Sequence, residues 1–366
     1  MDIQQVAVKL LQISFYGWEL WGNFALRNLE GMIQKKSRVV IAIFAVGVTS
    51  LMSFLKSEPT GGYSFKGSPT TKEQLGEVLF FEKALSLDSS ISCASCHIPE
   101  HGFADTAAFS HGVGGKLGKR NAPSCANVTD RPYLFYDGRA ASLEAQAQGP
   151  IEDKNEMANT IGEAARRLNN DAQYVAWFQK VFQSAPTPEL IKTAIASFER
   201  TLETSKTPFD RYMVNEDSTL LSISAQRGRE LFFNKAKCIE CHFSPDFTGD
   251  EFRNVGLFDG KKYNDSGRYN ITKDPKDMGK FKVPGLRNVA VTGPYMHNGM
   301  FKTLKEVIEY YNEPAKVVKH PINMDTTLQK PLHLSKQEMV DIEAFLVSLT
   351  DDRFHYKSQL SAPGKK

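Results

Sequence analysis

Two copies of the pattern Cys-x-x-Cys-His constrain this chain more than any other feature of its sequence. They are Cys93-Ala-Ser-Cys96-His97 and Cys238-Ile-Glu-Cys241-His242. Two thiols three residues apart on one helical turn reach both vinyl groups of a single porphyrin, and the adjacent histidine then lies under the iron as its proximal ligand. The two motifs therefore predict two covalently bound haem c groups.

Two other uses of paired cysteines compete with haem attachment. Four thiolates can form a structural zinc site, but such a site leaves the histidine beside each pair without a role. A thioredoxin-like redox pair belongs at a strand-to-helix turn, whereas both pairs here follow segments that predict helices. The fifth cysteine, Cys125, stands alone and is predicted to be a small core residue.

The composition is that of a globular protein and excludes two other classes. The 366 residues, 41% hydrophobic and 24% charged, are enough for two domains of ordinary size. A net charge of +3, without a stripe rich in Lys and Arg, gives no reason to expect nucleic acid as a partner. Five cysteines are few for a secreted scaffold held together by disulfides.

The N-terminal region, residues 1–57, differs from the rest of the chain. A basic cluster at 35–38 precedes an apolar stretch at 39–55, which is the order found in an export signal or a membrane anchor. A buried helix of a cytosolic domain is the alternative. Residues 58–70 are rich in Gly, Ser, Pro and Thr and predict a linker. We therefore expect a periplasmic protein, with the signal either cleaved or retained as a tether to the inner membrane.

The start of translation is open to a second interpretation. Residues 1–31 sit oddly ahead of an export signal, and Met32 begins a conventional signal sequence, Met32-Ile-Gln-Lys-Lys-Ser-Arg. A start at Met32 in place of Met1 is therefore a hypothesis. N-terminal sequencing of the native protein tests it.

An internal repeat organises the rest of the chain. The segments Thr71-Lys-Glu-Gln-Leu-Gly-Glu-Val-Leu-Phe-Phe and Ser224-Ala-Gln-Arg-Gly-Arg-Glu-Leu-Phe-Phe both predict helices, and each leads into a haem motif. Further amphipathic helices are predicted at 187–204 and at 335–349, and Ser335 with Glu338 forms a capping box at the start of the second.

These signals predict a mainly α fold. It consists of two cytochrome c-like haem domains in tandem, at 71–215 and 216–350, behind the N-terminal export or anchor segment. A polar stretch at 203–218 is expected to link the two domains, and residues 351–366 form a tail.

The second axial position of each haem decides what that haem can do. Two strong axial ligands make an electron carrier, whereas an open or labile face permits chemistry. Taken singly, each residue able to bind there is more often an ordinary surface or core residue than a ligand. The candidates are His101 and His111 in the first domain, and Met296, His297, Met300, Tyr311 and Met324 in the second.

Between about Gln74 and Leu349, a series of short motifs surrounds the two haem motifs in a fixed order. They are Gly102-Phe-Ala-Asp, Lys119-Arg-Asn-Ala-Pro123, Phe135-Tyr-Asp-Gly-Arg139, Leu143-Glu-Ala-Gln-Ala-Gln-Gly-Pro-Ile151, Asn155-Glu-Met157, Val283-Pro-Gly-Leu-Arg-Asn-Val289 and Gly293-Pro-Tyr-Met-His-Asn-Gly299. In these motifs the chain resembles the bacterial di-haem cytochrome c peroxidase family, which includes the methylamine-dehydrogenase maturation enzyme MauG. The resemblance implies a peroxidatic N-terminal haem and a C-terminal haem that stores and relays electrons.

Carried over by motif, Gln146 and Glu156 match the family's distal pair at the peroxidatic iron. The chemistry agrees, because cleavage of the O–O bond needs a base that takes a proton from peroxide and returns it to the leaving oxygen. An exposed helix glutamine and a glutamate in the first turn of a helix are the alternatives. His111, in the Gly-rich loop 109–118, matches the family's displaceable distal histidine, and glycine lets such a loop move.

Two aromatic residues match positions that set the redox chemistry of the family. Tyr311 lies where conventional peroxidases have an axial Met and MauG has an axial Tyr, and an anionic oxygen stabilises oxidised iron more than a thioether does. Met324 is the alternative ligand. Tyr136 stands where the family usually has a Trp between the haems, and oxidation of a tyrosine must release a proton.

The resemblance also implies a calcium site and a set of partners. Asn121, Thr292 and Pro294 match the family's inter-domain Ca²⁺ ligands, and amide and carbonyl oxygens suit that ion. A turn held by hydrogen bonds alone is the alternative. The implied partners are hydrogen peroxide, a small cytochrome c, cupredoxin or quinol chain as electron donor, and a second copy of the chain in a homodimer.

The function predicted is reduction of hydrogen peroxide to water at the N-terminal haem, with electrons relayed by the C-terminal haem. A MauG-like oxidase that modifies a partner protein is the first alternative, and a non-catalytic di-haem electron carrier is the second. Glu156 and Gln146 argue against the carrier, whereas Tyr311 keeps the MauG-like interpretation open.

Overall fold

The computed structural model describes residues 67–215, 217–351 and 353. Over these residues the structure is mainly helical, as predicted, and its two short strands, β1 (Phe252–Arg253) and β2 (Phe281–Lys282), pair antiparallel. The helices are α4 (Lys72–Phe80), α5 (Leu143–Glu152), α6 (Ile161–Asn169), α7 (Ala172–Phe182), α8 (Pro188–Glu199), α9 (Pro208–Asn215), α10 (Ile223–Phe233), α11 (Tyr269–Thr272), α12 (Leu304–Asn312) and α13 (Lys336–Val347).

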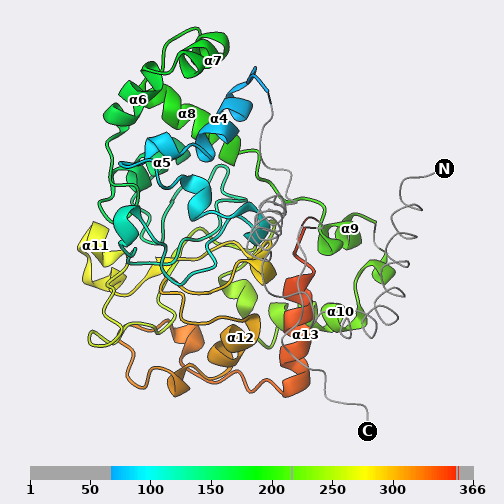
Figure 1. The fold of residues 1–366 in the computed structure, drawn as a ribbon. Coiled ribbons are helices and arrows are strands. Elements are labelled where there is room, and N and C mark those ends of the chain that lie inside the picture. The colour runs from blue at the N-terminus through cyan, green and yellow to red at the C-terminus, as the bar shows by residue number, and fades with distance from the viewer. Residues whose placement is uncertain (1–66, 216, 352, 354–366) are drawn as a thin grey trace, which may run out of the picture. The chain divides into compact units, whose positions relative to one another are not determined.

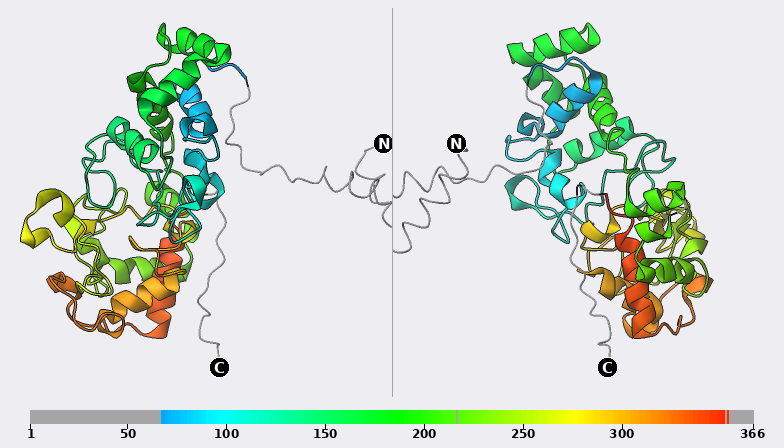
Figure 2. Two further views of the ribbon diagram at one scale, coloured as in Figure 1. Left: turned by 60° about the vertical axis from the view of Figure 1, so that its left-hand side comes forward. Right: turned by 90° about the vertical axis from the view of Figure 1, so that its right-hand side faces the viewer.

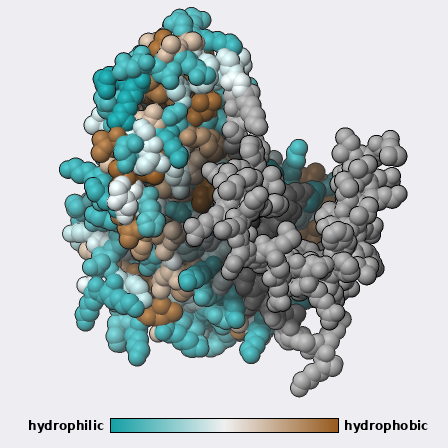
Figure 3. Space-filling view, in the orientation of Figure 1, coloured by the Kyte–Doolittle hydropathy of each residue, from teal (hydrophilic) through white to brown (hydrophobic). Residues whose placement is uncertain are grey.

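The helices pack around two hydrophobic cores, which define an N-terminal lobe (residues 71–202) and a C-terminal lobe (residues 209–349). In Figures 1 and 2, α4, α6, α7 and α8 lie together at one end, and α10, α12 and α13 lie at the other. The main helix contacts are α4 against α8 in the first lobe and α10 against α13 in the second. On the face drawn in Figure 3, hydrophilic residues cover most of the described surface, with hydrophobic residues in small groups.

Each lobe depends on a glycine at its helix crossing. A β-carbon added to Gly76 in α4 would lie 1.9 Å from the carbonyl oxygen of Ala194 in α8. A β-carbon on Gly228 in α10 would lie 1.8 Å from the carbonyl oxygen of Asp341 in α13. Only a residue without a side chain permits this approach, so the glycine before each Leu-Phe-Phe marks the same crossing twice.

A trio of phenylalanines closes around each crossing. The rings pack edge to face in both lobes, an arrangement that aromatic quadrupoles favour. The trios are Phe80, Phe103 and Phe198 in the N-terminal lobe, and Phe232, Phe247 and Phe345 in the C-terminal lobe. The repeat found in the sequence therefore extends to the side chains of the two cores.

The helix starts predicted at Thr71, Thr187 and Ser335 are confirmed. The helix predicted from Ser224 begins at Ile223 behind the cap Ser222, and the helix predicted at 187–204 ends at Glu199. The side chains of Thr71, Thr187 and Ser335 accept hydrogen bonds from backbone N–H groups in the first turns of α4, α8 and α13. Ser335 and Glu338 form the predicted capping box. Such caps satisfy backbone donors that have no partner inside the helix, which fixes where each helix begins.

The segment expected to link the two domains contains a helix. Within 203–218, α9 carries Phe209, which packs edge to face against Phe247 and Phe345 of the C-terminal core. The domain boundary between residues 215 and 216 stays a prediction, and Phe209 of α9 contacts the core of the C-terminal lobe. The composition of the polar stretch 203–218 did not predict this contact, because it depends on one buried aromatic residue.

The N-terminal segment predicted at 39–55 to be an export signal or anchor lies outside the described residues. Among the helices of the described part, none is long and apolar enough to cross a membrane. Most of the linker predicted at 58–70 and of the tail predicted at 351–366 also lies outside this part.

Partly buried ion pairs join the two lobes. Arg131 of the N-terminal lobe pairs with Asp246 and Asp250 of the C-terminal lobe, and Arg120 binds Asp265 through two hydrogen bonds of 2.7 and 2.8 Å. All five side chains are partly buried, so loss of one partner would leave a partly desolvated charge without its counter-charge. These pairs hold the walls of the inter-lobe cavity in place.

Substitution of the crossing glycines is expected to destabilise the fold. Gly76→Ala and Gly228→Ala each force a methyl group onto a backbone carbonyl, and overpacking of this kind costs about 1–3 kcal/mol or more. Gly162→Ala is the matched control, because nothing lies within 4 Å of its β-carbon position in α6, and it should be neutral or stabilising by up to about 1 kcal/mol. Chemical denaturation of the holoprotein measures all three, and equal stability of the variants would contradict the assignment.

Candidate active site

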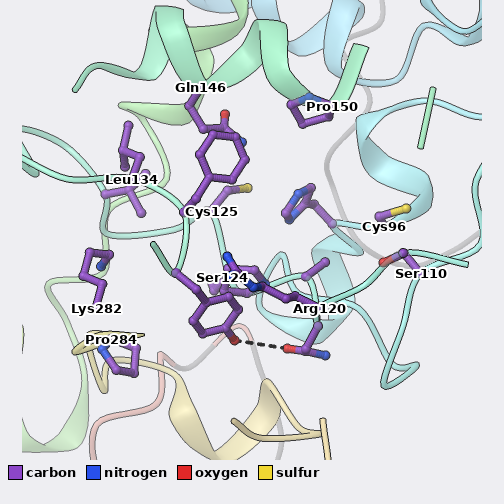
Figure 4. A pocket seen from close by; sticks show the side chains of 18 of the residues that line it. Cys96, Ser110, Arg120, Ser124, Cys125, Leu134, Gln146, Pro150, Lys282 and Pro284 are labelled. Carbon is purple, nitrogen blue, oxygen red and sulfur yellow. Dashed lines mark hydrogen bonds between the residues drawn. The ribbon is translucent and has the colours of Figure 1, made fainter. Parts of the chain in front are cut away.

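A cavity of about 920 Å³ lies between the two lobes and is lined by residues of both. Figure 4 shows Gln146 and Pro150 of α5 on one side, Cys96 and Ser110 on another, and Lys282 of the C-terminal lobe opposite. This volume is in the range of cavities that hold cofactors. The first haem motif forms part of its wall.

Cys93, Cys96 and His97 occupy a tight turn at the cavity wall. The Nδ1 atom of His97 donates a hydrogen bond of 3.1 Å to the carbonyl oxygen of Phe103. Burial lowers the pKa of His97, so the ring is neutral and its Nε2 atom keeps a lone pair for a metal ion. Two thiols and one oriented imidazole beside a large cavity are a donor set that fits haem c.

The second motif repeats this geometry in the C-terminal lobe. Cys238 begins the same kind of turn, and the Nδ1 atom of His242 donates to the carbonyl oxygen of Phe247 at 2.8 Å. Burial again lowers the pKa of the histidine. Within the described residues, no group of three or more His, Cys, Asp or Glu side chains is placed to hold a metal ion, so the cysteine pairs do not combine into a zinc site.

Gln146 and Glu156 face the same cavity as His97. Gln146 projects from α5, whose Ser142 cap fixes its start, and Glu156 lies in the loop that follows this helix. Burial raises the pKa of Glu156, and nearby Asp153 raises it further, while Arg139 opposes the shift. The carboxyl therefore binds protons more tightly than a glutamate in water, and it lies close enough to Cys96 to influence that thiol.

Comparison with known proteins identifies the family of this chain. Residues 70–218 match the family described as di-haem cytochrome c peroxidase, and residues 225–350 match the cytochrome c family. A cytochrome-c peroxidase, IdrP1, of Denitromonas iodatirespirans is 36% identical over 318 residues, which cover 78% of this chain and 83% of that protein. The chain belongs to the di-haem cytochrome c peroxidase family.

Other members of this family are similar to a comparable extent. The methylamine utilization protein MauG of Methylorubrum extorquens is 35% identical over 291 residues, covering 78% of this chain and 80% of that protein. The crystal structure of a MauG-like protein associated with microbial copper homeostasis has a TM-score of 0.69 and 32% identity, and covers 82% of this chain and 98% of that chain. As a member of the di-haem peroxidase family, this protein is an oxidoreductase with two covalently bound haem c groups.

His111 is not brought to the cavity of this di-haem protein. Its side chain is exposed and is not among the residues that line the cavity. The loop that carries it is held to the segment of Glu156, because the N–H of Val113 donates to the carbonyl oxygen of Glu156 at 2.8 Å. A β-carbon on Gly112 would lie 2.0 Å from the carbonyl oxygen of Asn155, so the loop approaches this segment closely. Binding of iron by His111 requires this loop to move.

Tyr136 begins a chain of aromatic contacts at the lobe interface. Its ring packs edge to face against Phe281 at a centroid distance of 6.4 Å, and Phe281 stacks on His297 at 3.8 Å. Burial raises the pKa of the Tyr136 phenol, whose hydroxyl donates a long hydrogen bond of 3.5 Å to Asn121 Oδ1. Burial lowers the pKa of His297 to about 4, so this ring is neutral.

The residues predicted as axial ligands in the C-terminal lobe lie in different surroundings. Burial raises the pKa of Tyr311, and Cys241 and Cys238 are near enough to raise it further. No hydrogen bond of its hydroxyl is found within the described residues, whereas the neighbouring Tyr310 donates to Val255. The Sδ atom of Met324 lies 3.1 Å from the β-carbon position of Gly256, which the Tyr310 hydroxyl also approaches.

The remaining candidates occupy other surroundings. The Nε2 atom of His101 hydrogen-bonds to the carbonyl oxygen of Gly293 across the lobe interface. The side chains of Met296 and Met300 pack against the small core that contains Tyr310.

The three residues predicted to bind calcium all line the inter-lobe cavity. The amide nitrogen of Asn121 donates to the carbonyl oxygen of Ala107 at 3.1 Å, which leaves its Oδ1 atom as an acceptor. Thr292 and Pro294 flank Gly293 in the adjacent turn of the C-terminal lobe.

Two charged residues of the cavity wall were not expected from the sequence. Glu199 at the end of α8 is buried, and Lys282 in β2 is held among Asp250 and Arg131 with a lowered pKa caused by burial. Neither belongs to a recognisable motif. Alignment of the two repeats would have shown the first, because the sequence Ser-Phe-Glu-Arg after position 196 stands opposite Ala-Phe-Leu-Val after position 343.

Haem attachment at both motifs predicts a definite thiol count. Each thioether bond consumes one cysteine, so four of the five cysteines are consumed and only Cys125 remains. Burial raises the pKa of Cys125 well above its ordinary value, so the native protein should not react with a thiol reagent. The denatured protein should release one equivalent of thiol, and a Cys125→Ala variant should release none. Three or more equivalents in the denatured protein would exclude attachment at one of the motifs.

Proposed function

We propose that this family member reduces hydrogen peroxide to water in the inter-lobe cavity beside His97, with electrons arriving through the C-terminal lobe. The observation that carries the proposal is the carboxyl of Glu156, which lines this cavity together with Gln146 and the first haem motif. Haem bound at His97 would supply an iron that accepts an oxygen of peroxide and passes electrons to it. The chain's own residues supply the proton transfers.

Glu156 is suited to act as both base and acid. Peroxide must lose a proton from one oxygen and regain it on the leaving oxygen, so a single carboxyl within reach of both oxygens can serve both steps. Burial raises the pKa of Glu156, which makes its carboxylate a stronger base than one in water. Gln146 has an amide that both donates and accepts hydrogen bonds, so it can orient peroxide between Glu156 and the iron.

Tyr136 and Phe281 lie on the interface that an electron must cross. Their edge-to-face contact joins a residue of the N-terminal lobe to β2 of the C-terminal lobe. The Tyr136 hydroxyl has only the amide of Asn121 as a hydrogen-bond partner within the described residues, so no base takes its proton there. We therefore propose that Tyr136 mediates electron transfer without itself losing a proton.

A MauG-like oxidation of a partner protein is the second candidate function. Tyr311 favours it, because its phenol lies near Cys238 and Cys241 and a phenolate ligand would stabilise oxidised iron. The similarity to MauG is about as great as the similarity to IdrP1. A carrier without catalysis is not favoured, because it gives the buried carboxyl of Glu156 no role.

We further propose that the protein works in the periplasm and binds Ca²⁺ between its lobes. Haem c and the basic and apolar segments at 35–55 support export. The Oδ1 atom of Asn121 and the backbone carbonyls of Thr292 and Pro294 would be the Ca²⁺ ligands, with water completing the shell. The electron donor would be a small cytochrome c, a cupredoxin or the quinol chain.

Glu156→Gln is expected to lower kcat/KM for peroxide by roughly 10²- to 10⁴-fold, because the amide cannot accept and return a proton. In the wild type, kcat/KM should fall as the pH drops through the raised pKa of Glu156, above the ordinary value of 4.5. The variant should lack this acid limb. Glu152→Gln, an exposed change on the same segment, is the control, and full activity of Glu156→Gln would contradict the role.

Stopped-flow absorbance with stoichiometric peroxide separates the two candidate functions. If His111 must first leave the iron, only the half-reduced protein should react, and the protein is a conventional peroxidase. If the fully oxidised protein reacts at once, the site is open at rest and the MauG-like function leads. Tyr311→Met should then abolish the reaction of the oxidised form, because a thioether stabilises oxidised iron less. Inertness in every redox state would leave only the electron carrier.

A further inference from the structure

Glu199 is a buried carboxyl to which the proposed peroxide chemistry gives no role. It is the last residue of α8, it is 5% exposed, and it lines the inter-lobe cavity together with Cys93 and Cys125. Its Oε2 atom is buried and has no hydrogen-bond partner within the described residues. Burying an unpaired carboxyl oxygen costs free energy, so its position on the cavity wall points to a use.

The C-terminal lobe has an apolar residue at the position equivalent to Glu199. The contacts of the crossing glycines and of the phenylalanine trios show that α8 and α13 occupy equivalent places in their lobes. Phe198 of α8 is equivalent to Phe345 of α13. The residue that follows is Glu199 in the first helix and Leu346 in the second. Leu346 is also buried, at 7% exposure, so the fold itself accepts an apolar side chain there.

The surroundings of Glu199 leave its charge uncompensated. Arg200 is the cation that acts on it, but Arg200 donates hydrogen bonds of 2.8 and 3.1 Å to Glu144, and that carboxylate opposes its effect. The other titratable groups facing it are the thiols of Cys93, which haem attachment consumes, and of Cys125, which burial keeps neutral. Burial raises the pKa of Glu199 to about 8, so its proton is labile near neutral pH.

We propose that Glu199 takes up one proton from solvent when the haem site beside His97 gains one electron, and releases that proton when the electron leaves. The electron lowers the charge at the iron by one unit, from ferric to ferrous. The proton converts the Glu199 carboxylate into a carboxylic acid, so the net charge of the buried site is unchanged. The proposal rests on haem being held at His97 and does not depend on peroxide reduction.

The direction of the coupling follows from electrostatics in a space removed from water. The extra positive charge of oxidised iron stabilises the carboxylate of Glu199, and this stabilisation is lost on reduction. The affinity of Glu199 for its proton is therefore higher in the reduced state. Conversely, deprotonation of Glu199 stabilises the oxidised state, so the midpoint potential of the N-terminal haem falls as the pH rises. Leu346, at the equivalent position of the C-terminal lobe, cannot take up a proton.

The test is a spectroelectrochemical titration of the holoprotein without peroxide, at pH values below and above about 8. In the wild type, the midpoint potential of the N-terminal haem should fall as the pH rises through about 8, and Glu199→Gln should remove the dependence in this range. Glu189→Gln removes a charge from the same helix at a side chain that is 76% exposed, and it should keep the wild-type dependence. Retention of the dependence in Glu199→Gln, or its absence in the wild type, would overturn the proposal.

A second measurement covers the case in which Glu199→Gln fails to assemble with haem. The reduced-minus-oxidised infrared spectrum of the wild type should show the gain of a carbonyl band of a protonated carboxylic acid. Absence of this gain would also overturn the proposal. Because neither measurement uses peroxide, a failure of the proposed peroxidase activity would leave both results interpretable.

Discussion

In each lobe, the backbone of one helix lies against the backbone of another at a glycine, and three phenylalanine rings close around the crossing. One ring of each trio, Phe103 or Phe247, also supplies the carbonyl oxygen that accepts the hydrogen bond of the proximal histidine. Both of these phenylalanines have left-handed backbone conformations, with φ of 59° and 57°. Such a conformation is held only when its surroundings fix it. The crossing therefore fixes the imidazole, and the imidazole fixes where iron can bind.

The chemistry of the cavity depends on a second constraint, the burial of charge between the lobes. Arg120 and Arg131 reach across the interface to aspartates, which joins the two walls of the cavity. A buried carboxyl that forms no ion pair has a raised pKa, and burial raises the pKa of Glu156 and of Glu199 despite the opposing effects of Arg139 and Arg200. The arginines of the interface thus pair with aspartates and leave these two acids outside ion pairs, as the proposed proton transfers require.

Most of the fold could be predicted from local sequence patterns, because helix caps and haem motifs depend on residues only a few positions apart. Thr71, Thr187 and Ser335 begin helices for a reason visible within four positions. Contacts between residues far apart in the chain could not be predicted from these local patterns. The packing of Phe209 in the second core needs Phe247 and Phe345, which lie far along the chain. The same holds for the site. Its motif residues were predicted, whereas Glu199 belongs to no motif and only a comparison of the two repeats places it at a core position.

The two lobes share one framework but differ in the side chains that face their haem positions. The N-terminal lobe places an amide and two acids around a large cavity, and the C-terminal lobe places a phenol near its cysteines and a leucine where the other has Glu199. A redox centre surrounded by groups that hold protons can combine electron transfer with proton transfer. At the position of Leu346 the C-terminal lobe has no side chain that can take up a proton, although Glu251 and Asp325 act on Cys241 of its haem motif. Duplication of the framework thus lets the two lobes place different side chains around equivalent haem motifs, which the proposed division into a peroxidatic haem and an electron-relaying haem requires.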